Sequence, residues 1–395
     1  MLTVAAAGVR SEGFTSAGLF RDDAWVALSA RVGLGTAWHM WVSAPGFFFL
    51  ERLFIEVGPA ATWWAQIPPF VAGVLCVPSI YALARYFRAT PLGGLASAAL
   101  VCASPICVTY STRVKEYPVD FLLTCALLAT FEAARRSAGG RRHLAWCAAV
   151  SVAAFLFSAS TAIVIIAGWS VLGVCVLQDR SRHARKTFAG LGAAGAAGCA
   201  VIAAVFYLQI SPKLKLFWLE NSGFMTRHPL SQFASSLEHT AWTLLSGLFG
   251  FGDFGSMARL AIIVVWLLLS AVGLSRDRAL LVAGVAVLLA FAADLAQLLP
   301  LGTGRTDEYL YPVILLLPLA GLVRLLEAVA PWAEERARRM RRQVTVVLAA
   351  VVAVGSLVLI GRAATDVPAY PGVAVQALAA AIRQQEKPGD HIYVN

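Results

Sequence analysis

Residues 118–135 read PVDFLLTCALLATFEAAR, an apolar stretch with charged residues only near its two ends. A helix of about 20 apolar residues is long enough to cross the hydrocarbon core of a bilayer. Similar blocks recur along the chain and are separated by polar connections. We expect ten membrane spans, at residues 61–84, 91–110, 118–135, 143–158, 159–177, 187–209, 259–275, 279–299, 309–327 and 343–361.

The composition of the whole chain agrees with this pattern. Of the 395 residues, 59% are hydrophobic and only 14% are charged, whereas a soluble domain has about 25% charged residues. The mean hydropathy is +0.73. All 7 cysteines lie inside apolar stretches without metal-ligand spacing, which favours a role as small core residues. The sequence therefore predicts an all-α polytopic membrane protein.

The net charge of +10, from 32 Lys and Arg against 22 Asp and Glu, would raise the question of nucleic acid in a soluble protein. Here the arginines gather in short loops near span ends, which the positive-inside rule assigns to the cytoplasm. The alternate connections hold most of the acidic residues and are predicted to face the outer or periplasmic side. The excess charge thus indicates orientation in the plasma (inner) membrane, and no nucleic-acid partner is expected. The basic loops contain Arg85 and Arg88; Arg135, Arg136, Arg141 and Arg142; Arg180, Arg182, Arg185 and Lys186; Arg276 and Arg278; and Arg336, Arg338, Arg339, Arg341 and Arg342.

Two parts of the chain depart from the pattern of apolar spans. Residues 240–255 form a short apolar run interrupted by glycines, so we expect a re-entrant or interfacial element on the outer side. Residues 1–361 are predicted to form the transmembrane domain, with a first outer loop at 21–60. Residues 362–395 combine an amphipathic helix pattern, a turn and a strand-like end, HIYVN. They are predicted to be the start of a small α/β soluble domain on the outer side.

The first outer loop carries an acidic pair, Asp22-Asp23, followed by an amphipathic stretch and the helix-like segment FFFLERLFIEVG at 47–58. Its many aromatic residues are typical of amphipathic helices in the headgroup region. Carboxylates beside such a belt lie where a lipid-borne phosphate or sugar is presented. Capping of the following helix accounts for the acidic pair equally well.

The second outer loop, YSTRVKEYPVD at 110–120, places ionisable residues at the edge of a span, which makes them functional candidates. Lys115 and Arg113 could instead anchor the chain by snorkelling. Asp120 could be a helix N-terminal charge, and Tyr110 and Tyr117 could belong to the aromatic belt. Tyr117 and Asp120 are three residues apart, so both are expected on one face of the helix that begins here.

Together with two further segments, these loops resemble, in order, the motifs of polytopic glycosyltransferases with the GT-C fold, specifically the family 39/83-like enzymes related to protein mannosyltransferases and aminoarabinose transferase. Residues 21–25 are similar to the Asp-Glu element of the first loop. Residues 43–53 are similar to the His-Pro-Pro element and its aromatic helix, although Ser43-Ala44 replaces His-Pro. Residues 110–120 resemble a Lys-x-Tyr-x-x-Asp pattern, and residues 304–312 a late Gly-Arg…Pro element.

The resemblance implies transfer of a hexose or pentose from a polyprenyl-phosphate donor to an envelope glycan, lipid or protein, on the outer membrane face and with inversion. Asp22 would be the general base, and Asp23 would orient the acceptor or help to hold a divalent metal ion. The donor phosphate would be bound by Lys115, Arg305 and Arg113, and the site would be shaped by Tyr117, Asp120 and Tyr110.

Two alternatives to an enzyme remain open from the sequence. A transporter or flippase of a lipid-linked saccharide would show internal repeats and ionisable groups near mid-span, where Asp294 is the only acid deep within a predicted span. An inactive relative or fragment would retain the pattern of spans without the activity. Loss of sugar transfer on substitution of Asp22 would distinguish the enzyme from both.

Overall fold

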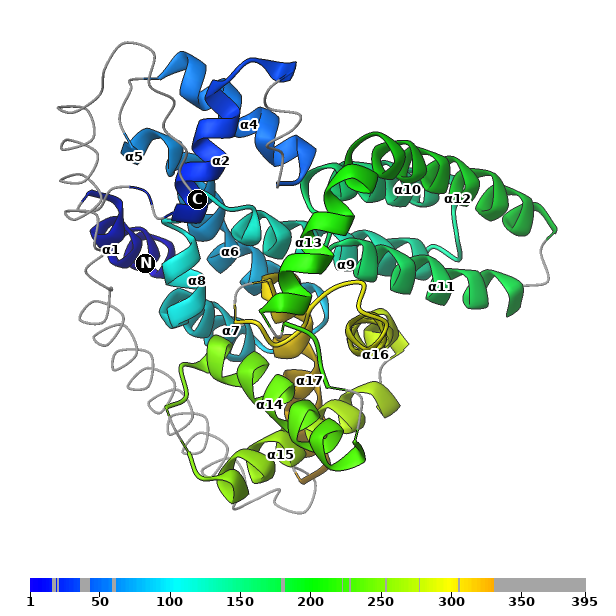
Figure 1. Ribbon diagram of the computed structural model, residues 1–395. Helices are drawn as coiled ribbons and strands as arrows, with labels where there is room; N and C mark the ends of the chain where they lie inside the picture. Colours follow the sequence, from blue (N-terminus) through cyan, green and yellow to red (C-terminus); the bar gives the residue numbers. More distant parts are fainter. Residues whose placement is uncertain are drawn as a thin grey trace, which may run out of the picture.

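The computed structural model describes residues 1–15, 19, 21–35, 43–58, 62–178, 182–221, 223–226, 229–252, 254–276, 278–304 and 306–329. Within these ranges the chain is helical and contains no strand (Figure 1). The predicted all-α class is confirmed. The predicted span at 343–361 and the predicted α/β segment at 362–395 lie outside the described residues.

The chain begins with α1 (Leu2–Thr15), and the predicted first outer loop contains α2 (Arg21–Arg31) and α4 (Pro45–Val57), which pack on each other. The amphipathic helices expected in this loop are therefore present. A short helix, α5 (Thr62–Ala65), leads into the main bundle. The following helices are α6 (Ile67–Tyr86), α7 (Pro91–Ala103), α8 (Pro105–Tyr110), α9 (Tyr117–Arg136), α10 (Arg141–Phe157), α11 (Ala162–Gln178), α12 (Arg182–Ile202), the π-helical turn η1 (Ala203–Tyr207), α13 (Leu208–Glu220), α14 (Leu230–Phe249), α15 (Ser256–Arg276), the 3-10 turn η2 (Arg278–Leu280), α16 (Leu281–Leu295), the 3-10 turn η3 (Glu308–Leu310) and α17 (Tyr311–Val329).

Five helical segments in the described ranges are long and apolar enough to cross a membrane: Trp63–Tyr86, Tyr117–Arg136, His183–Tyr207, Ser256–Ser275 and Glu308–Leu325. The apolar helices α7, α11 and α16 are shorter, at 13, 17 and 15 residues. The predicted spans between residues 61 and 327 therefore correspond to a mixture of full-length and shorter helices in the described part of the chain.

Three predicted segments have different boundaries in the structure. The span at 91–110 divides into α7 and α8, because Ser104 is extended (ψ 120°) immediately before Pro105, as a residue preceding proline prefers. The span at 187–209 belongs to a longer helical stretch that continues through α13. The element expected at 240–255 is α14, which begins at Leu230 and ends where Gly250 adopts the left-handed conformation (φ 67°), a common helix terminator.

Helix α9 occupies the centre of the bundle, where it packs against α6, α10 and α11. Figure 1 shows α10, α11 and α12 together on one flank and α14 and α15 on another, with α17 packed along α15. The main hydrophobic core lies between these groups and includes Ile80, Phe121, Phe131 and Leu172. This arrangement holds the end of α8 close to α6 and to the start of α9, and α9 also packs on η3 and α17.

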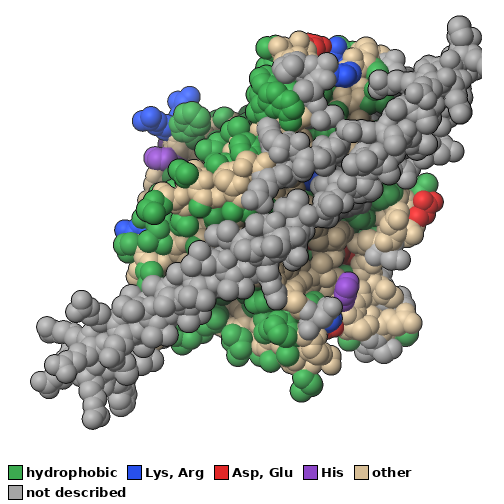
Figure 2. Space-filling view, turned by 90° about the vertical axis from the view of Figure 1, so that its left-hand side faces the viewer, with side chains coloured by type: hydrophobic (Ala, Val, Ile, Leu, Met, Phe, Trp, Pro, Cys, Tyr) green, Lys and Arg blue, Asp and Glu red, His purple; other side chains and the backbone are tan. Residues whose placement is uncertain are grey.

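Two of the long apolar helices are barely buried within the protein. In the most apolar 18 residues of the segment His183–Tyr207, only 11% are buried inside the protein. The corresponding share for Ser256–Ser275 is 17%. Figure 2 shows hydrophobic side chains over much of the described surface of one face, with few charged ones. Apolar side chains left on the surface of helices of this length are suited to contact with lipid.

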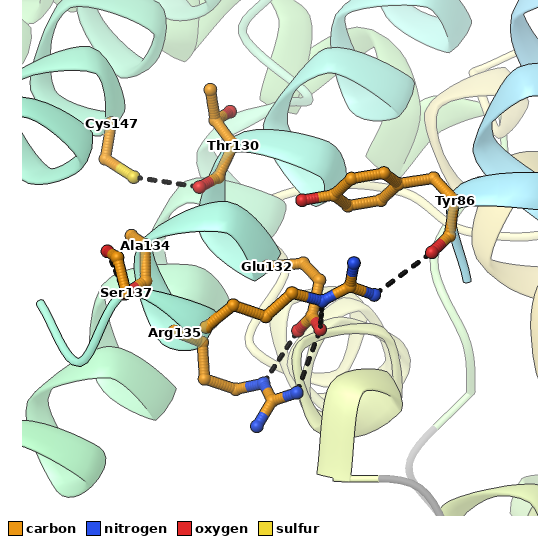
Figure 3. Close-up of polar contacts among 8 residues, drawn as sticks. Tyr86, Thr130, Glu132, Ala134, Arg135, Ser137 and Cys147 are labelled. Atoms are coloured by element: carbon orange, nitrogen blue, oxygen red, sulfur yellow. Dashed lines mark hydrogen bonds and ion pairs between the residues drawn. The ribbon is translucent and has the colours of Figure 1, made fainter. Parts of the chain in front are cut away.

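A buried carboxylate, Glu132, fixes the C-terminal end of α9 (Figure 3). It accepts hydrogen bonds from Arg135 at 2.7 and 2.8 Å and from Arg136 at 2.6 Å. Arg136 also donates to the carbonyl of Tyr86 at 3.0 Å and lies 4.4 Å above its ring. Arg136 thus ties the end of α9 to the end of α6, which brings two of the arginine-rich connections side by side.

Other basic connections meet at the same end of the bundle. Arg88, Leu280 and Arg324 line one small cavity of about 160 Å³, so the ends of α6 and α17 lie beside η2. The opposite end of α6 and the start of α9 lie beside the second outer loop, which contacts the acidic first loop through Arg113 and Asp23. The two-sided distribution of charge predicted from the sequence is therefore present in these helices.

Candidate functional site

The acidic pair and the second outer loop meet in an ion pair. Arg113 Nε donates to Asp23 Oδ2 at 2.5 Å, across 90 residues of sequence. The Asp23 side chain is 1% exposed and that of Arg113 is 12% exposed. Asp22 and Asp23 lie in the first turn of α2, where the helix dipole favours negative charge. Asp22 is partly exposed, so the two carboxylates have different environments.

The second outer loop is held from several sides. The rings of Tyr110 and Tyr117 meet edge to face with centroids 4.9 Å apart, and the guanidinium of Arg113 lies 5.9 Å from the centre of the Tyr110 ring. The side chain of Gln66 donates to the carbonyl of Thr112 at 2.6 Å. These contacts join the end of α8 to the starts of α6 and α9 and give the loop a defined shape.

Burial and the two nearby cations change the pKa of Asp23 in opposite directions. Burial raises the pKa of Asp23, while the charges of Arg113 and Lys115 and the Arg113 hydrogen bond lower it, and Asp22 raises it further. Burial outweighs the two cations, so the pKa of Asp23 is raised. The charge of Lys115 therefore acts on Asp23.

A second polar group lies deeper, at the start of α9. Asp120 is 1% exposed and forms a hydrogen bond with Ser158, while its Oδ1 has no partner among the described residues. The hydroxyl of Tyr207 donates to the carbonyl of Phe155 at 2.9 Å and interacts electrostatically with Asp120. Pro118 lies in the first turn of α9, as predicted. Tyr117 and Asp120 both lie in the first turn of α9.

Two buried acids near these groups, Glu51 of α4 and Glu308, and the partly buried Glu116 were not assigned to the site from the sequence. Glu51 is fully buried, and neither of its carboxylate oxygens has a partner in the described ranges. Burial raises the pKa of Glu51 well above its usual value, and the charge of Asp23 raises it further. Burial also raises the pKa of Glu116 despite the opposing charge of Lys115. The site thus contains more carboxyl groups than cations.

Two aspartates shape the connection between α16 and α17. Asp294 accepts hydrogen bonds from the backbone N–H groups of Met225 at 2.8 Å and Leu301 at 2.7 Å. Asp307 accepts from the N–H groups of Gly302 at 3.1 Å and Gly304 at 3.0 Å. Both glycines have positive φ, a conformation that glycine adopts readily. Arg305, predicted to bind phosphate, follows this turn but lies outside the described residues.

Asp307 is expected to make stability depend on pH. Burial raises the pKa of Asp307 from 3.8 to about 7, although the hydrogen bonds that it accepts from backbone N–H groups lower this pKa. The folded state therefore binds the additional proton between about pH 4 and pH 7, and the free energy of unfolding should fall as the pH rises through this range. In Asp307→Asn this contribution is absent. Thermal unfolding of both proteins in detergent from pH 4.5 to 8 should show a difference that changes with pH; parallel curves would contradict it.

The resemblance implies that Asp23 helps to hold a divalent metal ion, and this role stays a prediction. Within the described residues no group of three or more His, Cys, Asp or Glu side chains is placed to hold a metal ion. Carboxylate oxygens without a hydrogen-bond partner in the described ranges are buried in this region at Asp23, Glu51, Asp120 and Glu308.

The structure brings most of the predicted site residues into one region at the ends of α2, α8 and α9. Asp23, Arg113, Tyr110 and Tyr117 are in direct contact or share a partner. Glu51 and Glu308 were harder to recognise as site residues, because each lies beside a run of aromatic and apolar residues that indicates a helix.

Known proteins share both the sequence pattern and the fold. The model of the family described as dolichyl-phosphate-mannose-protein mannosyltransferase matches residues 42–207. This segment contains the second outer loop but does not include Asp22, Asp23 or Arg305. No curated protein matches the sequence significantly.

Two solved structures of ArnT from Cupriavidus metallidurans superimpose on nearly the whole chain. The apo structure has a TM-score of 0.56 at 15% identity, and the structure bound to undecaprenyl phosphate has a TM-score of 0.55 at 16% identity. Each comparison covers 99% of this chain and 81% of the ArnT chain. The predicted resemblance is therefore confirmed: this chain has the GT-C fold of ArnT, and residues 42–207 match the protein mannosyltransferase family.

Proposed function

We propose that the protein is an integral membrane glycosyltransferase that moves a hexose or pentose from a polyprenyl-phosphate donor to an envelope glycan, lipid or protein. The observation that carries this proposal is the buried contact between Asp23 and Arg113. It brings a pair of carboxylates together with a loop of cations and phenols at one end of the bundle. The similar ArnT structure contains bound undecaprenyl phosphate, which supports a donor of this class.

In the proposed reaction, Asp22 takes the proton from the acceptor hydroxyl as that oxygen attacks the anomeric carbon, and configuration at this carbon is inverted. A carboxylate close to the nucleophile contributes typically about 10²–10⁴-fold to the rate of such a step. Asp22 suits this role because it is partly exposed. Asp23 is held by Arg113 and would orient the acceptor.

The leaving group is a polyprenyl phosphate, so negative charge increases on its oxygen as the sugar departs. Fixed cations placed where charge develops lower the barrier. Lys115 and Arg113 would bind this phosphate, with Arg305 from the following glycine-rich turn, and Tyr110, Tyr117 and Asp120 would shape the sugar pocket. Lys115 is well placed because its charge already acts on Asp23 and Glu116.

An apolar groove supports a lipid-linked donor. The groove, about 570 Å³ in volume, lies between α10, α11 and α12, and its lining includes Phe155, Ile165 and Trp169. The carbonyl of Phe155 accepts the hydroxyl of Tyr207, which interacts with Asp120. The groove thus begins beside the proposed site, and its apolar lining suits an isoprenoid chain.

We further propose that the protein spans the plasma (inner) membrane several times, with its active site on the outer or periplasmic side. The connections of α6 and α9 that carry arginine lie at the end of the bundle opposite Asp23. Short basic loops of this kind remain in the cytoplasm, which places the acidic end outside.

Replacement of Lys115 by Met is expected to raise the Kd for undecaprenyl phosphate by about 10–100-fold, because one charge-assisted contact to the phosphate contributes about 1.5–3 kcal/mol. Binding to the purified protein in nanodiscs would measure this change. Lys115→Arg should retain most of the affinity, and replacement of the exposed Lys215 by Met serves as the matched control. Equal affinities for all four proteins would contradict the assignment of Lys115.

A direct assay of sugar transfer separates this function from a flippase. Membranes containing the protein should transfer labelled sugar from a polyprenyl-phosphate donor to an envelope acceptor. A flippase would move the donor across the bilayer without cleaving it. Asp294, the acid predicted deep within a span, has both carboxylate oxygens bonded to backbone N–H groups, which favours a structural role over transport.

A further inference from the structure

The break between α7 and α8 exposes backbone groups inside the bundle. In a continuous helix, the carbonyl of Val101 would accept from the N–H of residue 105, and the carbonyl of Cys102 from that of residue 106. Pro105 has no N–H, and the extended Ser104 takes the chain out of the helical path. Carbonyls without partners are strongly unfavourable in a membrane-embedded protein. These two therefore need donors from elsewhere.

Arg10 of α1 supplies those donors. Its side chain is fully buried. Nη2 donates to the carbonyl of Val101 at 3.1 Å, and Nη1 donates to that of Cys102 at 3.3 Å and to that of Ala6 at 3.4 Å. The fixed fork of the guanidinium suits this task, because a lysine ammonium cannot reach several carbonyls in one plane.

The same guanidinium also reaches the start of the second outer loop. Arg10 Nε donates to the hydroxyl of Ser111 at 2.9 Å, and that hydroxyl donates in turn to the carbonyl of Cys107. Ser111 is buried against α6 so closely that a Cβ at Gly73 would lie 1.9 Å from its hydroxyl oxygen. Ser111 is thus enclosed by Arg10, α6 and α8.

The position of Ser111 bears directly on the candidate site. Arg113, two residues further along, forms the ion pair with Asp23, and Lys115 follows after another two. Between Ser111 and Arg113, the carbonyl of Thr112 accepts a hydrogen bond from the side chain of Gln66. A shift of Ser111 would therefore be transmitted through a few bonds to both cations.

We propose that Arg10 is a positioning residue, which closes the break between α7 and α8 and, through Ser111, sets the place of the loop that carries Arg113 and Lys115. Its effect on sugar transfer rests on the proposed function, whereas its effect on the loop does not. Arg10 is the one charged residue in an otherwise apolar N-terminal decapeptide, MLTVAAAGVR. The structure gives a reason for its presence there.

Hydrogen–deuterium exchange of the purified full chain in nanodiscs tests the structural part. Arg10→Met should increase exchange of amides between residues 106 and 115 at least tenfold, while amides in the middle of α9 change little. Ser111→Ala removes the Nε contact and the hydrogen bond to the carbonyl of Cys107 but leaves the Arg10 donors to Val101 and Cys102 in place, so faster exchange should be confined to residues 109–115. Arg142→Met, which replaces an exposed arginine at the other end of the bundle, is the matched control and should leave these amides unchanged.

Enzyme kinetics test the consequence for donor binding. If Arg10 positions the loop, Ser111→Ala should raise KM for the lipid-linked donor several-fold with a smaller change in kcat, and Arg10→Lys should restore only part of the activity lost in Arg10→Met. Unchanged exchange at residues 106–115 in both Arg10→Met and Ser111→Ala would overturn the proposal, even where sugar transfer is intact. Faster exchange in a protein without transferase activity would uphold the role of Arg10 and reject the proposed function.

Discussion

Replacing Asp22 with Asn is expected to reduce kcat for sugar transfer by about 10²–10⁴-fold, which is the usual contribution of a positioned general base. Asn has nearly the same shape as Asp but cannot accept the proton of the acceptor hydroxyl at neutral pH. KM for the donor should change little, because Asp22 is not among the proposed phosphate ligands Lys115, Arg113 and Arg305. Steady-state transfer from a purified polyprenyl-phosphate sugar would measure both constants.

The neighbouring carboxylate provides a matched comparison. Asp23 is buried and paired with Arg113, whereas Asp22 is partly exposed. Asp23→Asn should therefore lower thermal stability as well as activity, and Asp22→Asn should lower activity alone. A kcat for Asp22→Asn within threefold of the unmodified protein would exclude Asp22 as the base and leave its place at the start of α2 as helix stabilisation.

The fold could be predicted from the sequence because apolar blocks of bilayer length are strong local signals. The helix at 118–135 appears as α9 with nearly the expected ends, since Pro118 marks its first turn and Arg135 and Arg136 its last. Boundaries were less accurate where a single residue redirects the chain. Pro105 splits an apolar block that composition alone presents as continuous, and Gly250 ends α14 instead of interrupting it.

The candidate site could be predicted only where residues form a local pattern. The acidic pair and the 110–120 loop each stand out in sequence, and their contact across 90 residues followed from placing both on the same side of the membrane. Arg10 is a single charge in an apolar stretch, whereas Glu51 and Glu308 each stand beside one other charged residue. Neither arrangement indicates the partner of these residues in the fold. Their burial is created by tertiary packing, which one sequence does not reveal.

The balance of charge in the site gives the ion pair a particular importance. Among the described residues, buried carboxyl groups such as Glu51 and Asp120 outnumber the cations nearby, and a buried carboxylate is stable only when it is paired or protonated. Arg113 lowers the pKa of Asp23 against the larger effect of burial, and so favours the ionised form of this side chain. Loss of Arg113 should have consequences for both the fold of the loop and the chemistry.

Separating Asp23 from Arg113 is accordingly expected to destabilise the protein by about 3–5 kcal/mol, as for other buried ion pairs that lose one partner. Asp23→Ala leaves a guanidinium that cannot lose its proton. The double variant Asp23→Ala/Arg113→Met removes both charges, so it should lose less stability than the sum of the single changes. The coupling free energy is expected to be about 1–3 kcal/mol. Thermal or denaturant unfolding in a fixed detergent would measure this cycle.

Arg113→Met should also shift the pH dependence of transfer, and the direction follows from the charges around Asp23. Arg113 lowers the pKa of Asp23 against the effect of burial. Without it the pKa of Asp23 rises, a larger fraction of the side chain is protonated at neutral pH, and transfer should recover as the pH is raised. Arg142→Met, at the opposite end of the bundle, should leave the profile in place. Strictly additive stability changes together with an unshifted profile would show that the contact between α2 and the second loop has no part in the reaction.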